Sequence, residues 1–183
     1  MSKLILKNVR LAFPDLFTAK AINAGDTPRY GAQLIVEKGS ANEAAIEAAI
    51  QEVAKAKWGV KAEETLRTLR AKTKICFLDG DLKSEYAGFA GNMSLSAGNT
   101  ARPTVVNRDR TPLTEADGVI YSGCYVNAIV EIWAQENTHG KRVNCSLRGI
   151  QFASDGEAFA GGGVASADEF EELTDTSAAD DFM

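Results

Sequence analysis

Apolar and polar residues alternate over a long stretch in the second half of the chain, from position 119 to position 135. The even-numbered positions carry small, mostly apolar side chains, while the odd-numbered positions carry Tyr121, Tyr125 and Trp133 among polar residues and glycine. A period of two predicts a strand with one face in a core. Residues 136–141 follow as a hairpin loop, and residues 142–152 are predicted to return as a second strand with Val143 and Leu147 facing inward.

Shorter apolar segments predict further strands over residues 3–12, 30–36, 74–78 and 104–106. Glycines within and around residues 88–98 favour a bent strand there. The turn-forming residues from Gly25 to Pro28 predict a loop over residues 14–29, and residues 107–112 form another loop.

A helix is predicted over residues 41–57. Ser40 and Glu43 have capping-box spacing, Ile46 and Ile50 recur at helical spacing, and Gly59 ends the segment. Residues 62–70 predict a second, shorter helix. Several strands with a helix inserted between the early ones indicate a mainly β protein, an OB-type five-stranded barrel with one or two inserted helices. A mixed α+β sheet is the alternative.

Charge divides the chain into two parts. Of its 25 acidic residues, nine lie in residues 155–183, and none of its 20 basic residues does. Residues 1–154 therefore carry a formal charge of +4 and residues 155–183 carry −9. The second part also has few apolar residues, so we expect a folded domain over 1–154 and a disordered acidic tail over 155–183.

Aromatic and basic residues of the body suggest binding to single-stranded DNA, because flat rings stack on unpaired bases and cations follow the phosphates. The alternative is that the rings pack in the core and the cations are ordinary surface charges. We expect base stacking by Tyr121, Tyr125, Tyr86 and Phe89. We expect phosphate contacts from Lys7, Arg10, Arg102, Arg108, Arg110, Lys141 and Arg142.

Signals for an enzyme are weak. The chain has no phosphate-binding loop, and His139 has no evident acidic partner. Asp79 and Asp81 are typical of a turn, although a metal-dependent nuclease built on them is a further alternative. We expect no cofactor, no metal site and no membrane segment. The odd number of cysteines, three, indicates reduced thiols and a cytoplasmic protein.

The chain ends with Asp180, Asp181, Phe182 and Met183. Acidic residues followed by a hydrophobic one predict docking on a basic partner with an apolar pocket. This end resembles the acidic tips of bacterial and phage single-stranded-DNA-binding proteins, although those end in phenylalanine and here Met183 follows.

The body resembles a phage family, formerly a domain of unknown function, whose members bind single-stranded DNA with an OB fold. The matching segments are residues 7–11 with Phe13 and Pro14, residues 121–127, and residues 147–152 running into 155–157. The resemblance implies sequence-independent, cooperative coating of single-stranded DNA in phage replication or recombination, inside the infected bacterial cell, with homo-oligomers on DNA. The tail would cover the DNA groove and recruit replication or recombination proteins. A non-enzymatic phage interaction or assembly protein with a tail that binds a basic partner is the alternative.

Overall fold

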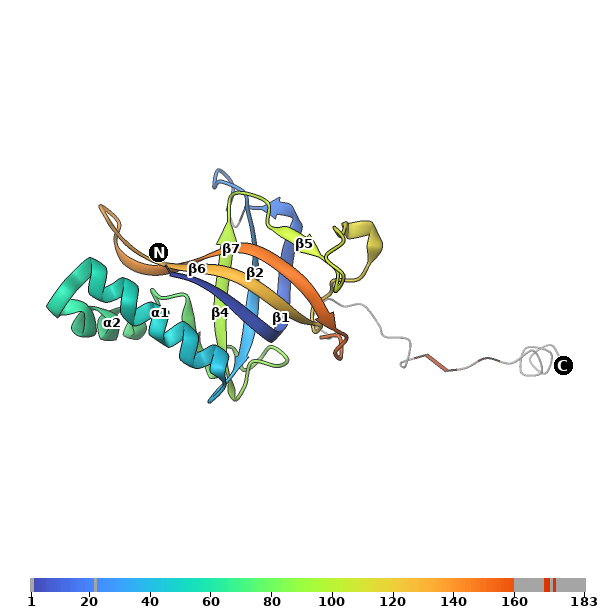
Figure 1. The fold of residues 1–183 in the computed structure, drawn as a ribbon, viewed down its shortest axis with the longest axis horizontal. Coiled ribbons are helices and arrows are strands. Elements are labelled where there is room, and N and C mark those ends of the chain that lie inside the picture. The colour runs from blue at the N-terminus through green and yellow to red at the C-terminus, as the bar shows by residue number, and fades with distance from the viewer. Residues whose placement is uncertain (1, 22, 160–169, 172, 174–183) are drawn as a thin grey trace.

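A computed structural model of the chain describes residues 2–21, 23–159, 170, 171 and 173 (Figure 1). The strands are β1 (Ser2–Lys20), β2 (Arg29–Glu37), β3 (Phe77–Asp79), β4 (Asn92–Asn99), β5 (Thr104–Val106), β6 (Tyr125–Asn137) and β7 (Gly140–Ser154). The helices are α1 (Ala41–Trp58) and α2 (Ala62–Ala71), with short 3-10 helices η1 (Gly59–Lys61), η2 (Gly80–Lys83) and η3 (Glu115–Asp117).

The sheet closes on itself. Its strand order is β3-β4-β2-β1-β6-β7-β5, and a parallel pairing between β4 and β7, at Gly98 and Ser146, joins the two sides. The closed part is a barrel of β1, β2, β4, β6 and β7. This confirms the predicted OB-type five-stranded barrel with inserted helices.

β1 is longer than predicted. The expected loop over residues 14–29 is wrong for its first part, because β1 continues to Lys20 and pairs with β2. The strand keeps its pairing through three irregularities: its register shifts between Leu6 and Val9 against β6, and against β2 it shifts between Ala12 and Asp15 and again between Asp15 and Lys20. A bulge of this kind bends a strand and tolerates a proline such as Pro14, which cannot donate a ladder hydrogen bond.

The predicted helices are confirmed. Ser40 is the N-cap of α1, and its Oγ accepts a hydrogen bond from the Glu43 amide at 3.3 Å. The Glu43 carboxylate accepts from the Gly39 amide, one residue before the position that a capping box uses. α1 covers one end of the barrel (Figure 1), where Ile46 and Ile50 join the core.

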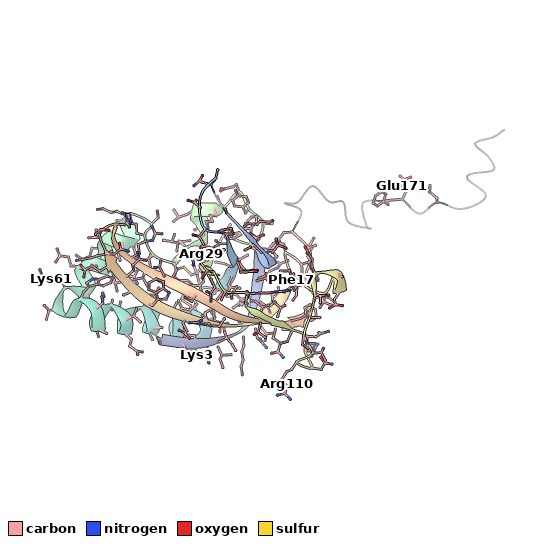
Figure 2. The ribbon with its side chains drawn as sticks, turned by 90° about the horizontal axis from the view of Figure 1, so that it is seen from above. Lys3, Phe17, Arg29, Lys61, Arg110 and Glu171 are labelled. Carbon is pink, nitrogen blue, oxygen red and sulfur yellow. The ribbon has the colours of Figure 1, made fainter. Side chains whose placement is uncertain are left out.

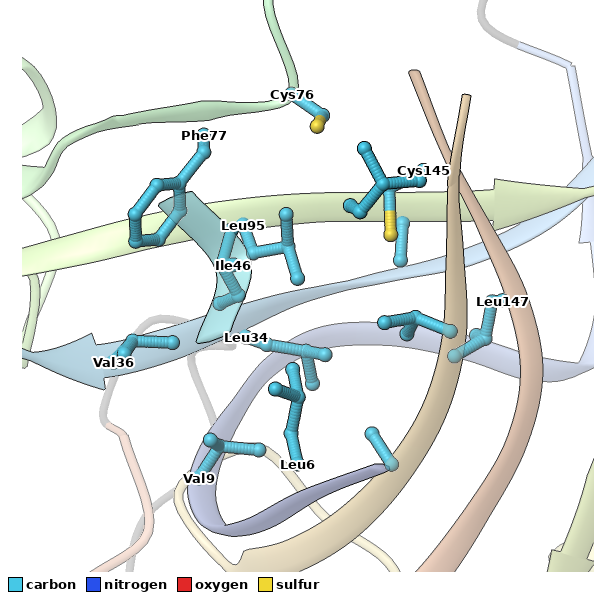
Figure 3. Close-up of a cluster of buried hydrophobic side chains, with 14 of the residues drawn as sticks. Leu6, Val9, Leu34, Val36, Ile46, Cys76, Phe77, Leu95, Cys145 and Leu147 are labelled. Carbon is cyan, nitrogen blue, oxygen red and sulfur yellow. The ribbon is translucent and has the colours of Figure 1, made fainter. Parts of the chain in front are cut away.

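The barrel interior is filled by aliphatic side chains. Leu6, Leu34, Leu95 and Leu147 are fully buried and converge with Ile46 of α1 (Figure 3). The inward positions predicted for the long strand are confirmed over its β6 part, where alternate residues from Val126 to Ile132 have no exposed surface.

The three cysteines are free, as predicted, and all three are buried. Burial raises the pKa of the Cys76 thiol to about 12.

Three strands begin later in the chain than predicted. β6 begins at Tyr125 rather than at position 119, because Gly123 adopts a φ of 111° and turns the chain just before it. β4 begins at Asn92 rather than at position 88, and β3 begins at Phe77 rather than at position 74. The hairpin is confirmed, but its predicted loop over residues 136–141 is too long, because Glu136 pairs with Lys141 and Asn137 with Gly140, which leaves Thr138 and His139 as the loop.

Candidate nucleic-acid interface

The outer face of β1, β2 and β4 carries polar side chains beside the buried apolar residues Ala12 and Ile35. Arg10 of β1 lies opposite Ile35 of β2, which in turn lies opposite Ser94 of β4. The Gln33 side-chain oxygen accepts hydrogen bonds from the hydroxyls of Ser94 and Ser96 at 2.8 and 2.9 Å. Strands 2 and 3 of an OB barrel form its usual oligonucleotide-binding face, and here they are β2 and β4.

Two adjoining hollows lie beside this face. The larger, of about 530 Å³, is lined by residues 7–10 of β1 together with Ile35, Gly88, Tyr125 and other side chains. The smaller, of about 300 Å³, is lined by Lys7, Asn8, Arg108, Gln151 and neighbouring residues. The two hollows adjoin at Lys7 and Asn8, which line both, and we call the combined surface the β1 groove.

Side-chain amides hold the bulged part of β1 that forms the wall of this groove. The amide of Asn42 accepts from the Lys7 backbone N–H at 3.2 Å and donates to the Lys7 carbonyl at 2.8 Å. The Asn127 side chain accepts from the Asn8 backbone N–H at 3.0 Å. The irregular backbone therefore keeps its hydrogen bonds without a regular partner strand.

The charge of the groove is mainly positive. Lys7 and Arg108 are exposed, and neither forms an ion pair among the residues that the structure describes. Arg10 is fixed in place, because its Nε donates to the Gly123 carbonyl at 3.0 Å and its Nη2 donates to the Glu157 carbonyl at 2.6 Å. Glu37 is an acidic residue in the lining of the larger hollow.

A group of aromatic rings borders the groove. The Phe13 and Tyr86 rings meet edge to face at 5.0 Å between centroids, and both centroids lie 6.1 Å from that of Phe89. Phe13 and Tyr86 are 47% and 45% exposed, whereas Phe89 is fully buried. The structure therefore does not support base stacking by Phe89, whose ring instead supports the other two. The sequence prediction missed Phe13, because the expected loop from Pro14 onward gave its ring no defined place.

Tyr121 has a different position from the one predicted. It precedes β6, its half-buried ring packs against the core, and its hydroxyl lies 2.8 Å from Asp155 Oδ1. Burial and the hydrogen bond to Asp155 raise the pKa of Tyr121. The structure thus gives Tyr121 a role in holding the C-terminal segment, while Tyr125 lines the groove.

Residues 155–159 continue from β7 and lie against the body, past the predicted domain boundary at Ser154. The Phe159 amide donates to the Ser122 carbonyl at 3.1 Å, and its ring packs on the buried residues Ala12, Ile35 and Phe89. The Arg10 guanidinium lies 4.3 Å from the centroid of the Phe159 ring. The predicted contact residues Asp180, Asp181 and Phe182, with most of the expected disordered tail, lie outside the described residues.

The predicted basic residues do not all converge. Lys141 pairs with Glu136 at 3.6 Å in the β6–β7 hairpin and lies 5.9 Å from the centroid of the Trp58 ring at the end of α1. Lys7 contacts Asn42 at the start of α1, and a helix rise of 1.5 Å per residue puts the two sites about 24 Å apart.

Lys141 and the adjacent exposed Arg142 are therefore separate from the groove, and the structure does not bring them together with the predicted phosphate contacts Lys7 and Arg108. Arg102 lies over Phe17 at 5.8 Å, and Arg110 occupies the loop that follows Arg108. Figure 2 places Arg110 and Lys61 at opposite ends of the body.

Asp79 and Asp81 face a cation of the protein itself. Lys38 Nζ lies 3.1 Å from the Asp79 carboxylate and 3.9 Å from that of Asp81. The Asp81 backbone N–H and Lys38 lower the pKa of Asp79. Within the described residues, no group of three potential ligands could hold a metal ion, and no helix is long and apolar enough to cross a membrane.

A closed five-stranded barrel with a basic and aromatic groove beside its second and third strands defines the OB class of polymer-binding domains. The chain belongs to one family within it. Residues 2–183 match the family model described as Enterobacter phage Enc34, ssDNA-binding protein.

The chain is also similar to individual proteins. Protein p50 of Acyrthosiphon pisum secondary endosymbiont phage 1 is 46% identical over 175 residues, which cover 94% of each chain. The single-stranded DNA-binding protein of bacteriophage Enc34, solved in complex with ssDNA, is 27% identical with a TM-score of 0.74, covering 86% of this chain and 89% of that one. The gp2.5 protein of bacteriophage T7 shares the fold at 11% identity, with a TM-score of 0.58 and 94% and 99% of the two chains covered.

Proposed function

We propose that this protein binds single-stranded DNA without sequence preference through the β1 groove. The observation that carries the proposal is the convergence of Lys7, Arg10, Arg108 and Tyr125 along one surface beside the outer face of β1, β2 and β4. The similarity to the Enc34 protein that was solved with ssDNA supports the same ligand.

The chemistry of the groove suits a flexible polyanion. Lys7 and Arg108 are exposed cations that neutralise phosphates and release counterions. Tyr125 and the exposed Tyr86 offer flat rings to unpaired bases, and stacking accepts any base. The protein binds the DNA without transforming it and uses no cofactor. The cations of Arg102 and Arg110 extend the path of the DNA strand where it leaves the groove.

The acidic C-terminal part competes with DNA for the groove. Residues 155–183 carry −9 against +4 for the body, and the first of them already lie beside the groove, with the Glu157 carbonyl bound to Arg10. DNA displaces the more distal acidic residues because it presents more negative charge. Asp180, Asp181 and Phe182 then recruit replication or recombination proteins, while further copies load cooperatively along the strand in the infected bacterial cell.

Fluorescence anisotropy of a labelled oligo-dT of roughly 30 nucleotides tests the binding. The full chain is compared with a chain ending at Phe159, at low and moderate salt, with a duplex of equal length as control. We expect tight, salt-sensitive binding to the single strand, weak binding to the duplex, and a gain when residues 160–183 are removed. Unchanged affinity after truncation contradicts the competition by the tail but not the groove.

A charge deletion tests the groove itself. Lys7→Ala should weaken binding and reduce the slope of log affinity against log salt by about one phosphate contact. Lys61→Ala is the matched control, because it removes the same charge at the far end of the helical region (Figure 2) and should leave the slope unchanged. Absence of binding by every form would leave the interaction or assembly protein as the better explanation.

A further inference from the structure

Phe13 combines exposure, an unusual backbone and a position beside the β1 groove. It is a large apolar side chain with 47% of its surface exposed, on the bulge between Ala12 and Asp15. Its φ is +49°, a conformation that side chains with a Cβ rarely adopt, and it precedes Pro14, which pushes the preceding residue toward extended backbone. Such strain persists where the surrounding structure holds it, and it is concentrated at functional sites.

The ring of Phe13 is held in a fixed orientation. Tyr86 meets it edge to face at 5.0 Å, and the buried Phe89 supports both rings from below. Lys83 lies on the same loop, with its Nζ 5.8 Å from the Phe89 centroid. An exposed ring that is supported on one side can stack on a flat ligand at little entropic cost.

The three-ring group also connects to the groove. Phe89 packs on Ile35, and Ile35 and Gly88 both line the larger hollow. Asn8, the other residue of β1 with a positive φ, lines both hollows. The two strained positions of this strand therefore shape neighbouring parts of one surface.

We infer that Phe13 is a base-stacking residue, which receives an unpaired nucleobase on its exposed face where the strand leaves the β1 groove. The inference rests on the proposed function and adds a residue to it. Tyr86 holds the Phe13 ring and borders the same base, and Lys83 meets the adjoining phosphate.

Phe13→Leu is the decisive variant, because leucine keeps an apolar side chain against Tyr86 and Phe89 but lacks a flat face. Its affinity is measured for oligo-dT and for an abasic oligonucleotide of equal length, which keeps the phosphates and has no bases. We expect the affinity for oligo-dT to fall by about 5- to 150-fold, the contribution of one stacked base, and the affinity for the abasic strand to stay the same. Val60→Ala, a fully exposed aliphatic residue in η1, is the control and should change neither.

If Phe13→Leu binds oligo-dT with the affinity of the unmodified protein, the inference is overturned. An equal loss of affinity for oligo-dT and for the abasic oligonucleotide would also overturn it, because such a loss indicates that Phe13 only shapes the groove. Failure of the unmodified protein to bind oligo-dT would instead overturn the proposed function. A second variant, Phe13→Trp, keeps the test independent of how well leucine packs. Its additional fluorescence, relative to a parent that already holds Trp58 and Trp133, should be quenched by oligo-dT and not by the abasic strand.

Discussion

Phe159 provides a quantitative test of where the folded body ends. The structure places its largely buried ring on Ala12, Ile35 and Phe89 and under the Arg10 guanidinium, 4.3 Å from the ring centroid. Through these contacts, residues 155–159 pack against the body. Phe159→Ala should then lower the free energy of unfolding, although the residue lies beyond the last strand.

The magnitude follows from burial and from the cation contact. Truncating a fully buried phenylalanine to alanine costs about 3–5 kcal/mol, and a ring at the edge of the body should lose about half of that. The interaction with Arg10 adds about 0.5–1 kcal/mol. We therefore expect a loss of about 2–3.5 kcal/mol, which for a domain of this size lowers Tm by about 4–14 °C.

Urea unfolding followed by circular dichroism measures this difference. Phe170→Ala is the matched control, because Phe170 is 72% exposed and a surface substitution should change stability by less than about 0.5 kcal/mol. A double-mutant cycle with Arg10→Met should return a coupling of about 0.5–1 kcal/mol. Equal stability of Phe159→Ala and the unmodified protein would refute the proposed anchoring.

Other parts of the structure give three further predictions. A thiol reagent at pH 8 should label the three cysteines only after the protein unfolds. Burial raises the pKa values of Cys76, Cys124 and Cys145 and keeps their thiols protonated in the folded protein. Rapid labelling of the native protein would contradict this prediction. Ser40→Ala should cost about 1 kcal/mol in urea unfolding through the lost N-cap of α1. Folding lowers the pKa of Asp79. The ionised carboxylate therefore stabilises the fold above its unfolded pKa, and this contribution disappears as the pH falls through the folded pKa. The difference in free energy of unfolding between the unmodified protein and Asp79→Asn should accordingly become zero in acid.

The sequence predicted the fold where the pattern is local. The capping residues and apolar spacing of residues 41–57 identify α1, and the alternation of small apolar residues identifies β6. The boundary of β6 was wrong because residues 119–124 continue the alternation, whereas the left-handed turn at Gly123 depends on close contact with the C-terminal segment. That contact lies more than 30 positions away along the chain and leaves no local signal.

The candidate site was predicted only in part, again because contacts between residues far apart in the chain leave no local signal. Lys7, Arg10 and Tyr86 were identified from residue type, and the structure brings them to one region. Residue type could not separate Phe89, which is buried, from Tyr86, which is exposed, because the difference depends on what packs over loop 84–91. It also could not show that Lys141 lies beside Trp58, at the other end of α1 from the groove.

The irregularities of β1 explain how one strand supplies so much of the site. In a regular strand, Lys7 and Arg10 would point to opposite faces, because they differ in parity. The register shift between Leu6 and Val9 adds a residue, so that both of these apolar side chains face the core while Lys7 and Arg10 both line the groove.

The second shift, between Ala12 and Asp15, has the same effect farther along the strand. Leu11 and Leu16 are both buried although they also differ in parity, and Phe13 between them is turned outward. A β-bulge re-aims side chains at the cost of a strained residue, and here the two left-handed residues, Asn8 and Phe13, lie at the first two of the three register shifts of β1. The strain in β1 is therefore the physical reason that a barrel strand can fill the core and still present cations and an aromatic ring along one outer surface.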